Sequence, residues 1–233
     1  MISEKVHCTS KSDHHNPTVS VLPDHSDTGQ TAFLHQIQAS PHPVILMMSS
    51  LYLLLFLLQG HLKELLPDTE KFGIIYNVSE INSGVQADLA KAEAVNQNLE
   101  CKVRTVSDAS DIAATVSALI SDGCTAIYIP TDNLIAANMP AVTSVTDEKK
   151  IPTICGEAGC VLGGGTITYG VNYYALGKQT ANQAIQILFN NVSPSNIPVG
   201  MQTSPEELDI VINEESVNKL GITIPDSIKK RMK

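Results

Sequence analysis

Four short apolar runs each end in residues that could bind a small polar molecule. The first group follows "FGII" and consists of Asn77, Ser79, Glu80, Asn82 and Ser83. The other groups are Thr131, Asp132 and Asn133 after "AIYIP", Gly156 and Glu157 after "PTIC", and Tyr169, Asn172 and Tyr173 in "YGVNYY". Hydroxyl groups and helix amino termini can hold a carboxylate. A carboxylate such as Asp132 or Glu157 can accept hydrogen bonds from an ammonium group, and tyrosine rings supply an apolar wall with a polar tip. These residue types suit a zwitterion or another small polar metabolite.

Each group also has an ordinary structural explanation. Ser, Asn and Asp are favoured helix caps, so Asn82 or Ser83 is expected to cap one helix and Asp132 or Asn133 the next. Gly156 can serve a tight turn. What favours a binding function is convergence, because the carboxyl ends of parallel strands share one rim, where such sheets hold ligands.

The same residues suit catalysis less well. The chain has no GxSxG elbow and no GxxxxGK[ST] phosphate loop. The glycines at 163–165 precede an expected strand, so they do not fit a dinucleotide fingerprint. All seven histidines lie within the first 61 residues, which leaves the following region without the commonest general base. Cys155 and Cys160 therefore lack a histidine partner there. We predict a protein that is not an enzyme and has no cofactor, with a small α/β enzyme of the flavodoxin or nucleotide-binding type as the alternative.

Composition excludes two further classes of protein. A net charge of −9 argues against a nucleic-acid partner, because a phosphate backbone needs a basic face. Five cysteines without a CxxC pair support neither a zinc knuckle nor a disulfide framework. Asp13, His14 and His15 lie together but lack the spacing of metal ligands, so no metal site is predicted.

The elements that must position the polar groups are expected between residues 61 and 228. Apolar runs predict strands at 71–77, 101–106, 124–130, 151–157 and 166–172, with a glycine loop at 159–165. Helical spacing predicts helices at 82–100, 111–123, 133–150 and 173–190, with Gly123 closing the second and Pro140 breaking the third near residue 139. This alternation predicts an α/β fold with a parallel sheet and helices on both faces.

Residues 1–60 form an atypical N-terminal segment without such alternation. It contains an apolar run of fifteen residues at 44–58, whereas a membrane span usually needs roughly 20. No small-residue cleavage site follows the run, and no lipobox precedes Cys8, so no clear signal peptide is predicted. Residues 229–233 form a basic tail.

Several stretches, taken in order, resemble the TrpX-like solute-binding proteins of ABC transporters. They are "KELLPDTEKFGIIYNVSEINS", "AIYIPTDNLIA", "IPTICGEAG", "TYGVNYYALGKQTANQAIQIL" and "GITIPDSI", and they run from about residue 61 to residue 228. The resemblance implies one lobe of a type I periplasmic-binding fold, in which two α/β lobes close on a ligand. It implies capture of a small solute such as an aromatic amino acid, delivery to an ABC permease, and an extracytoplasmic, membrane-associated location. It also implies that the polar groups named above contact the ligand, with Asp132 on its ammonium group and Ser79 or Ser83 on its carboxylate.

The first 60 residues depart from that family, because they lack the repeats expected of a first lobe. We therefore expect a truncated member whose affinity for ligand is weakened or lost. The helix at 173–189, with Leu176, Ala184, Ile187 and Leu188 on its inward face, would then lack its usual partner. Its apolar face is expected to associate with a second copy or to be covered by residues 44–58. A non-binding interaction remnant is a further alternative.

Overall fold

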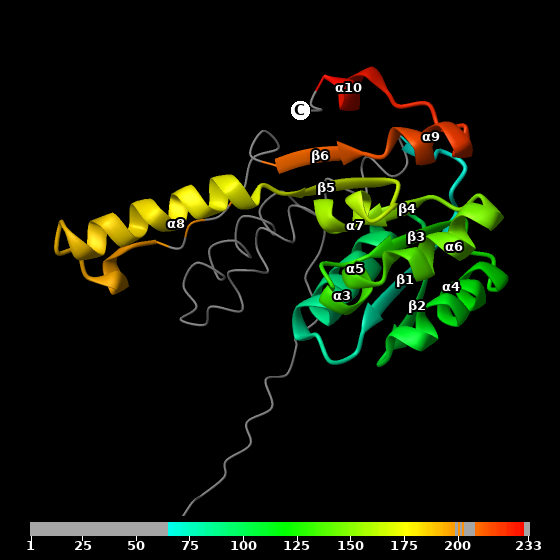
Figure 1. The fold of residues 1–233 in the computed structure, drawn as a ribbon, viewed down its shortest axis with the longest axis horizontal. Helices are drawn as coiled ribbons and strands as arrows, with labels where there is room; N and C mark the ends of the chain where they lie inside the picture. The colour runs from blue at the N-terminus through cyan, green and yellow to red at the C-terminus, as the bar shows by residue number, and fades with distance from the viewer. Residues whose placement is uncertain (1–64, 199, 201, 203–207, 231–233) are drawn as a thin grey trace, which may run out of the picture.

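The computed structural model describes residues 65–198, 200, 202 and 208–230, which are drawn in colour in Figure 1. The predictions for residues 1–60, with their apolar run at 44–58, lie outside the described residues. So does most of the basic tail.

A six-stranded sheet organises the described residues. Its strands are β1 (Lys71–Asn77), β2 (Glu100–Val106), β3 (Ala126–Ile129), β4 (Thr153–Cys155), β5 (Ile167–Val171) and β6 (Leu208–Ile212). They lie in the order β2-β1-β3-β4-β5-β6. The first five strands are mutually parallel, as predicted, but β6 runs antiparallel to β5, with Tyr169 paired to Ile210. The sheet is therefore mixed rather than purely parallel, because the chain returns after β5 to add an edge strand of opposite direction.

Helices cover both faces of the sheet, so the α/β prediction is confirmed. On one face, α3 (Ile81–Asn96) and α10 (Asp226–Lys229) close a core that includes Phe72 and Ile74. On the other face, α4 (Ile112–Ser121) and α6 (Met139–Lys149) pack over Ile75 and Ile127, together with α5 (Asn133–Ala137) and α7 (Ala158–Leu162). The described residues also form two short 3-10 helices, η1 (Ala109–Asp111) and η2 (Pro194–Asn196), and helix α9 (Glu214–Leu220). Successive side chains of the central strands point alternately into the two cores. The sequence of these strands is therefore almost continuously apolar.

Local signals place several boundaries as predicted. Gly123 follows α4 with φ +89°, and its N–H donates to the Ile120 carbonyl at 2.9 Å. Such a left-handed residue is the usual helix ending. Pro140 lies in the first turn of α6, so the predicted helix at 133–150 is divided at Asn138 into α5 and α6. The predicted glycine loop at 159–165 is wrong in its first half, because residues 158–162 form α7.

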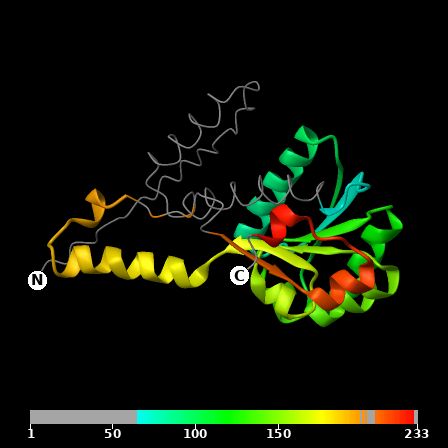
Figure 2. The same ribbon diagram turned by 90° about the horizontal axis from the view of Figure 1, so that it is seen from above.

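Helix α8 (Tyr173–Leu188) leaves the rest of the fold at the end of β5 and extends away from it (Figures 1 and 2). None of its sixteen residues is buried. The predicted inward orientation of Leu188 is wrong, since this residue is 71% exposed, while Leu176, Ala184 and Ile187 are partly buried. The sheet with its covering helices, without α8, is called the α/β body.

Candidate ligand-binding site

Asp132 ties two loops together where β1 and β3 end. Its side chain is 1% exposed. Asp132 Oδ2 accepts the backbone N–H of Asn77 at 2.6 Å, and Oδ1 accepts the N–H of Ile135 at 3.0 Å. The second bond caps α5, which confirms the predicted capping role. Both carboxylate oxygens are therefore engaged by the backbone.

Glu80 caps the same helix from the neighbouring loop. Its Oε1 accepts the N–H groups of Asn133 at 2.9 Å and Leu134 at 3.2 Å, and its Oε2 accepts the Asn133 side-chain amide at 3.1 Å. A carboxylate at a helix amino terminus satisfies unpaired N–H groups and complements the helix dipole. Two carboxylates thus join the loop after β1 to the loop after β3. Asp132 reaches from the second loop to the first, and Glu80 reaches from the first to the second.

Asn82 and Ser83 do not cap α3 as predicted. Helix α3 begins at Ile81, and its cap residue Glu80 makes no side-chain capping bond. Instead, Asn82 Nδ2 and Ser83 Oγ both donate to the Thr131 carbonyl, at 2.8 and 2.9 Å. The predicted cap failed because α3 begins one residue earlier, at Ile81, and both side chains instead reach the Thr131 carbonyl in the loop after β3.

Glu157 is placed differently from the other two carboxylates. It precedes α7 in extended backbone (φ −149°) and makes no side-chain cap bond. Its partner is the Tyr173 hydroxyl, which donates to Glu157 Oε2 over a long 3.4 Å. Desolvation, followed by the nearby Glu157 carboxylate, raises the pKa of Tyr173 above its usual value. Glu157 is partly buried, so it offers a carboxylate in a partly desolvated setting beside an aromatic ring.

A close backbone approach holds Glu157 beside Thr131. A Cβ atom at Gly156 would lie 2.7 Å from Thr131 N and 2.8 Å from the Pro130 carbonyl carbon. Gly156 N–H also donates to the Ile129 carbonyl at 2.7 Å. Only glycine allows the loop after β4 to pack this closely on the loop after β3.

Asn172 anchors the start of α8. Its Oδ1 accepts the Ala175 N–H at 2.7 Å, and its Nδ2 donates to Asp209 at 3.0 Å. Gln202 pairs with the Asn172 backbone in both directions, accepting at 2.9 Å and donating at 2.8 Å. Sequence reasoning missed Gln202 and Asp209, because they follow Asn172 by 30 and 37 residues and carry no local motif.

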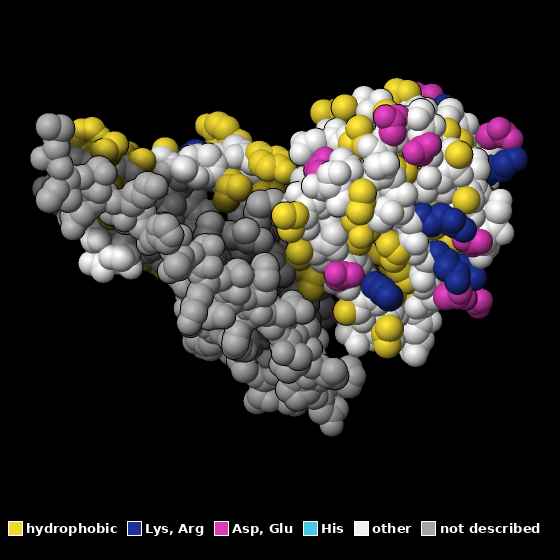
Figure 3. Space-filling model, turned by 90° about the horizontal axis from the view of Figure 1, so that it is seen from below, with side chains coloured by type: hydrophobic (Ala, Val, Ile, Leu, Met, Phe, Trp, Pro, Cys, Tyr) yellow, Lys and Arg dark blue, Asp and Glu magenta, His cyan; other side chains and the backbone are white. Residues whose placement is uncertain are grey.

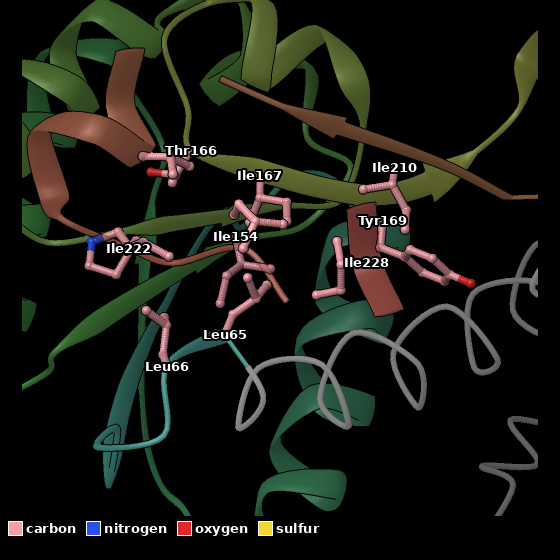
Figure 4. Close-up of a pocket in the computed structure, with 12 residues that line it drawn as sticks. Leu65, Leu66, Ile154, Thr166, Ile167, Tyr169, Ile210, Ile222 and Ile228 are labelled. Carbon is pink, nitrogen blue, oxygen red and sulfur yellow. The ribbon is translucent and has the colours of Figure 1, made fainter. Parts of the chain in front are cut away.

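Tyr169 is not brought to the rim with the other predicted residues. It is 4% exposed and belongs to the core beneath α3 and α10. There it lines an apolar hollow with Ile154, Ile210 and Ile228, as Figure 4 shows. Apart from Tyr169 and Thr166, the lining of this hollow is aliphatic. It does not offer the charges that a zwitterion needs, so the rim is the better candidate site.

Two buried polar atoms near the rim were also missed by sequence reasoning. Gln86, on the buried face of α3, accepts the Thr131 N–H through Oε1 at 2.9 Å. Its Nε2 and the Thr168 Oγ1 are buried without a hydrogen-bond partner among the described residues. The sequence could have indicated Gln86, because its helical spacing places it on the same face of α3 as the buried Ser83, Ala87 and Ala90.

The rim therefore brings together the predicted residues except Tyr169, but they have different roles. Asp132, Glu80, Asn82 and Ser83 join the first two loops, and Asn172 sets the start of α8. Glu157 and Tyr173 do neither. The Glu157 carboxylate accepts no backbone N–H from the described residues, and the Tyr173 ring lies beside it. Within the described ranges, no cluster of three or more His, Cys, Asp or Glu side chains could hold a metal ion. None of the described helices is long and apolar enough to cross a membrane.

Known proteins are similar to this chain over about 70% of its length. A family model described as ABC transporter substrate binding protein matches residues 60–233. A tyrosine-binding protein from Clostridioides difficile (strain R20291) is 37% identical over 160 residues, covering 69% of this chain and 45% of that protein. A second relative, an uncharacterised protein from Rickettsia prowazekii, is 24% identical over 163 residues, which cover 70% of this chain and 52% of that protein. The chain thus spans about half the length of the curated relatives it matches.

Two solved structures are similar to this chain in both sequence and fold. The ABC domain in complex with L-Trp from Streptococcus pneumonia is 31% identical with a TM-score of 0.65, and the match covers 74% of this chain and 57% of that one. A ligand-free, open substrate-binding protein with adhesive properties from Clostridium difficile is 34% identical with a TM-score of 0.60, covering 72% and 55%. These relatives are substrate-binding proteins rather than enzymes, and their lobe has the type I periplasmic-binding fold predicted for this chain. The chain belongs to the family of ABC transporter substrate-binding proteins.

Proposed function

We propose that the rim at the carboxyl ends of β1, β3, β4 and β5 forms one wall of a binding site for an aromatic amino acid. The observation that carries the proposal is the setting of Glu157. It is a partly buried carboxylate whose one hydrogen-bond partner among the described residues is the Tyr173 hydroxyl at 3.4 Å, and none of their backbone N–H groups donates to it. A carboxylate with free lone pairs can accept a charge-assisted bond from an ammonium group, and the Tyr173 ring can pack on an aromatic side chain.

The roles proposed for individual residues follow from which of their atoms are already engaged. Asp132 was predicted to bind the ligand's ammonium group, but its oxygens accept two backbone N–H groups. We assign Asp132 a positioning role and give the ammonium group to Glu157. Ser83 donates to Thr131, whereas Ser79 is exposed, so Ser79 is the better candidate for the ligand's carboxylate. The relatives that bind tyrosine and tryptophan support an aromatic ligand.

The partner and location of the protein are proposed on family membership. In this proposal the protein is the solute-binding component of an ABC importer and delivers its ligand to a membrane permease. It works outside the cytoplasm in association with the membrane. The α/β enzyme considered as an alternative has no support in the family or in the rim geometry.

A second proposal concerns α8. Its exposed apolar residues include Ile185 and Leu188, which are 48% and 71% exposed, and Phe189, directly after the helix, is 76% exposed. Lys178 is its one charged residue, and Figure 3 shows apolar side chains along α8 while most charged ones lie on the α/β body. Exposed apolar patches favour association, so we propose that this face mediates contact with a second copy of the chain.

A thermal-shift panel tests the ligand proposal. The full chain is melted with L-tyrosine, L-tryptophan and L-phenylalanine, and with two analogues of tyrosine. Tyramine lacks the carboxylate, and 3-(4-hydroxyphenyl)propionate lacks the ammonium group. Free ligand at 100 times its Kd stabilises the folded state by about 2.7 kcal/mol, which corresponds to a rise in Tm of roughly 5–10 °C for a chain of this size.

The Glu157→Gln variant identifies the group that recognises the ammonium. It should lose most of the shift with the amino acid and leave the small shift with the propionate analogue unchanged. Glu148→Gln is the matched control, because Glu148 pairs with Lys149 on the exposed end of α6. A flat response of a cooperatively melting wild-type protein across the whole panel would contradict the proposal.

A further inference from the structure

Three side chains of α3 hold the backbone of Thr131, a residue of the loop after β3. Asn82 Nδ2 and Ser83 Oγ donate to the Thr131 carbonyl, and Gln86 Oε1 accepts the Thr131 N–H at 2.9 Å. Thr131 lies outside any strand or helix, so its two backbone groups have no partner in a regular ladder and must find one elsewhere. The place of this loop is therefore fixed by α3.

Gln86 makes its contact with Thr131 from inside the core. It is 0% exposed, and the Tyr128 hydroxyl also donates to its Oε1, over 3.4 Å. Its Nε2 is buried without a hydrogen-bond partner among the described residues, and an amide group buried in this way costs free energy. A methionine of similar size would avoid that cost but would leave the Thr131 N–H unpaired. The contact with Thr131 thus explains the glutamine better than packing does.

The nitrogen atom that Gln86 holds is also the atom on which Gly156 packs. A Cβ atom at Gly156 would lie 2.7 Å from Thr131 N and 3.1 Å from Thr131 Oγ1. Gly156 immediately precedes Glu157. A shift of the Thr131 backbone would therefore reach Glu157 through a single residue that has no side chain to absorb it.

Gly170 of β5 supports the same part of the chain. A Cβ atom at Gly170 would lie 3.4 Å from the Gly156 carbonyl oxygen and 3.6 Å from Glu157 Cα. The backbone of β5 therefore also packs on the loop after β4. Glu157 rests on β5 directly and on Thr131 through Gly156, and α3 fixes the second of these supports.

We propose that Gln86 is a positioning residue for ligand binding, which acts on the Glu157 carboxylate through Thr131 and Gly156. The proposal rests on the function proposed above, in which Glu157 receives the ammonium group of an aromatic amino acid. Gln86 is fully buried, so it sets where the carboxylate lies and does not contact the ligand. A charge-assisted hydrogen bond depends on distance and angle, so a displaced carboxylate binds the ammonium group more weakly.

Two substitutions of Gln86 separate positioning from stability. Gln86→Met nearly keeps the volume and removes the acceptor for the Thr131 N–H, whereas Gln86→Glu keeps an acceptor oxygen at the same place along the side chain. Both should lower the free energy of unfolding, the first by leaving a buried N–H unpaired and the second by burying an ionisable group. In calorimetric titrations of the full chain, Gln86→Met should bind L-tyrosine severalfold more weakly than wild type, and Gln86→Glu should bind it nearly as well. Equal affinity of all three proteins, or equal losses in the two variants, would overturn the proposal.

Val116→Ala is a control for stability alone. Val116 is 0% exposed in α4 and belongs to the core on the other face of the sheet, where truncation leaves a cavity. This variant should lose stability without a change in the Kd for L-tyrosine. A loss of affinity equal to that of Gln86→Met would show a general effect of destabilisation and would also overturn the positioning role.

The route through Glu157 is tested by combining two substitutions. Gln86→Met should weaken binding in the wild-type background and have little further effect in the Glu157→Gln background. It should also leave the binding of 3-(4-hydroxyphenyl)propionate unchanged, because this analogue has no ammonium group. The same severalfold loss in both backgrounds would overturn the route through Glu157.

Hydrogen exchange of the full chain tests the structural connection without a ligand. Gln86→Met should speed exchange in the segments 130–133 and 155–159. Gln97→Met is the matched control, because Gln97 lies at the end of α3 and donates to Glu93 of the same helix, so both segments should exchange as in wild type. Unchanged exchange at 155–159 in Gln86→Met would overturn the positioning role. Failure of every form to bind an amino acid would instead count against the proposed function, and the exchange data would still decide the role of Gln86.

Discussion

Replacing Asp132 by Asn separates a positioning role from a ligand contact. In the structure, one carboxylate oxygen accepts the Asn77 N–H at 2.6 Å, and the other accepts the Ile135 N–H at 3.0 Å. Asparagine keeps one acceptor oxygen but places an NH2 group opposite one of the two backbone donors. At a side chain that is 1% exposed, water cannot replace the lost partner.

The size of the effect follows from these two bonds. A hydrogen bond to a charged group contributes about 1.5–3 kcal/mol, and a buried donor left without a partner costs about 1–3 kcal/mol. Asp132→Asn loses one bond and weakens the other, so we expect a loss of about 2–4 kcal/mol in the free energy of unfolding. Because domains are stable by roughly 5–15 kcal/mol, this loss is large enough to measure by urea unfolding.

Asp108→Asn is the matched control. Asp108 also caps a turn, by accepting the Ser110 N–H at 2.8 Å, but on an exposed residue. Its replacement should cost well under half as much, because water can satisfy the groups that lose a partner. The reasoning would be refuted if Asp132→Asn unfolded at the same urea concentration as wild type but no longer bound an amino acid. That result would return the ammonium contact to Asp132.

Three further perturbations have expected outcomes. Gly156→Ala should lower the free energy of unfolding by about 1–3 kcal/mol, since its Cβ would meet fixed backbone atoms. Gly177→Ala in α8, where nothing lies within 4 Å, should not destabilise the protein; equal losses would contradict the contact argument. The pKa of Asp122 is lowered by its Arg104 hydrogen bond, so its stabilising effect is present above its unfolded pKa and is lost as pH falls below about 4. The urea midpoints of wild type and Asp122→Asn should therefore converge over that range, and a constant difference would argue against the ion pair. Leu188→Glu should weaken any dimer seen by sedimentation, whereas the exposed Asn182→Glu should not; an equal effect of the two would exclude the apolar face of α8.

Much of the fold could be predicted because its signals are local. The all-apolar run at 126–129 indicated a strand covered on both faces, and each of its residues is buried. Gly123 and Pro140 marked helix boundaries through their own backbone preferences. The direction of β6 had no such signal, because pairing between β5 and β6 joins residues about 40 apart in the chain.

The site was predicted in outline but not in its roles. Strand ends indicated which loops would meet, and Glu80, Asp132 and Glu157 all lie in those loops. Their residue types alone do not say which carboxylate keeps its lone pairs free. Glu80 is engaged by the N–H groups of Asn133 and Leu134, more than 50 residues away. Tyr169 was misplaced because alternation along β5 turns its ring into the core, while Tyr173 lies beyond the strand at the start of α8.

The central claim is that Glu157 recognises the ammonium group of an aromatic amino acid. Calorimetric titration of L-tyrosine into the full chain and into Glu157→Gln tests it most directly. The account predicts saturable binding to the wild-type protein and a Kd at least about tenfold weaker for the variant, because a charge-assisted bond contributes about 1.5–3 kcal/mol and each 1.4 kcal/mol is tenfold. Equal affinities for the two proteins, with Glu157→Gln folded as wild type, would contradict it.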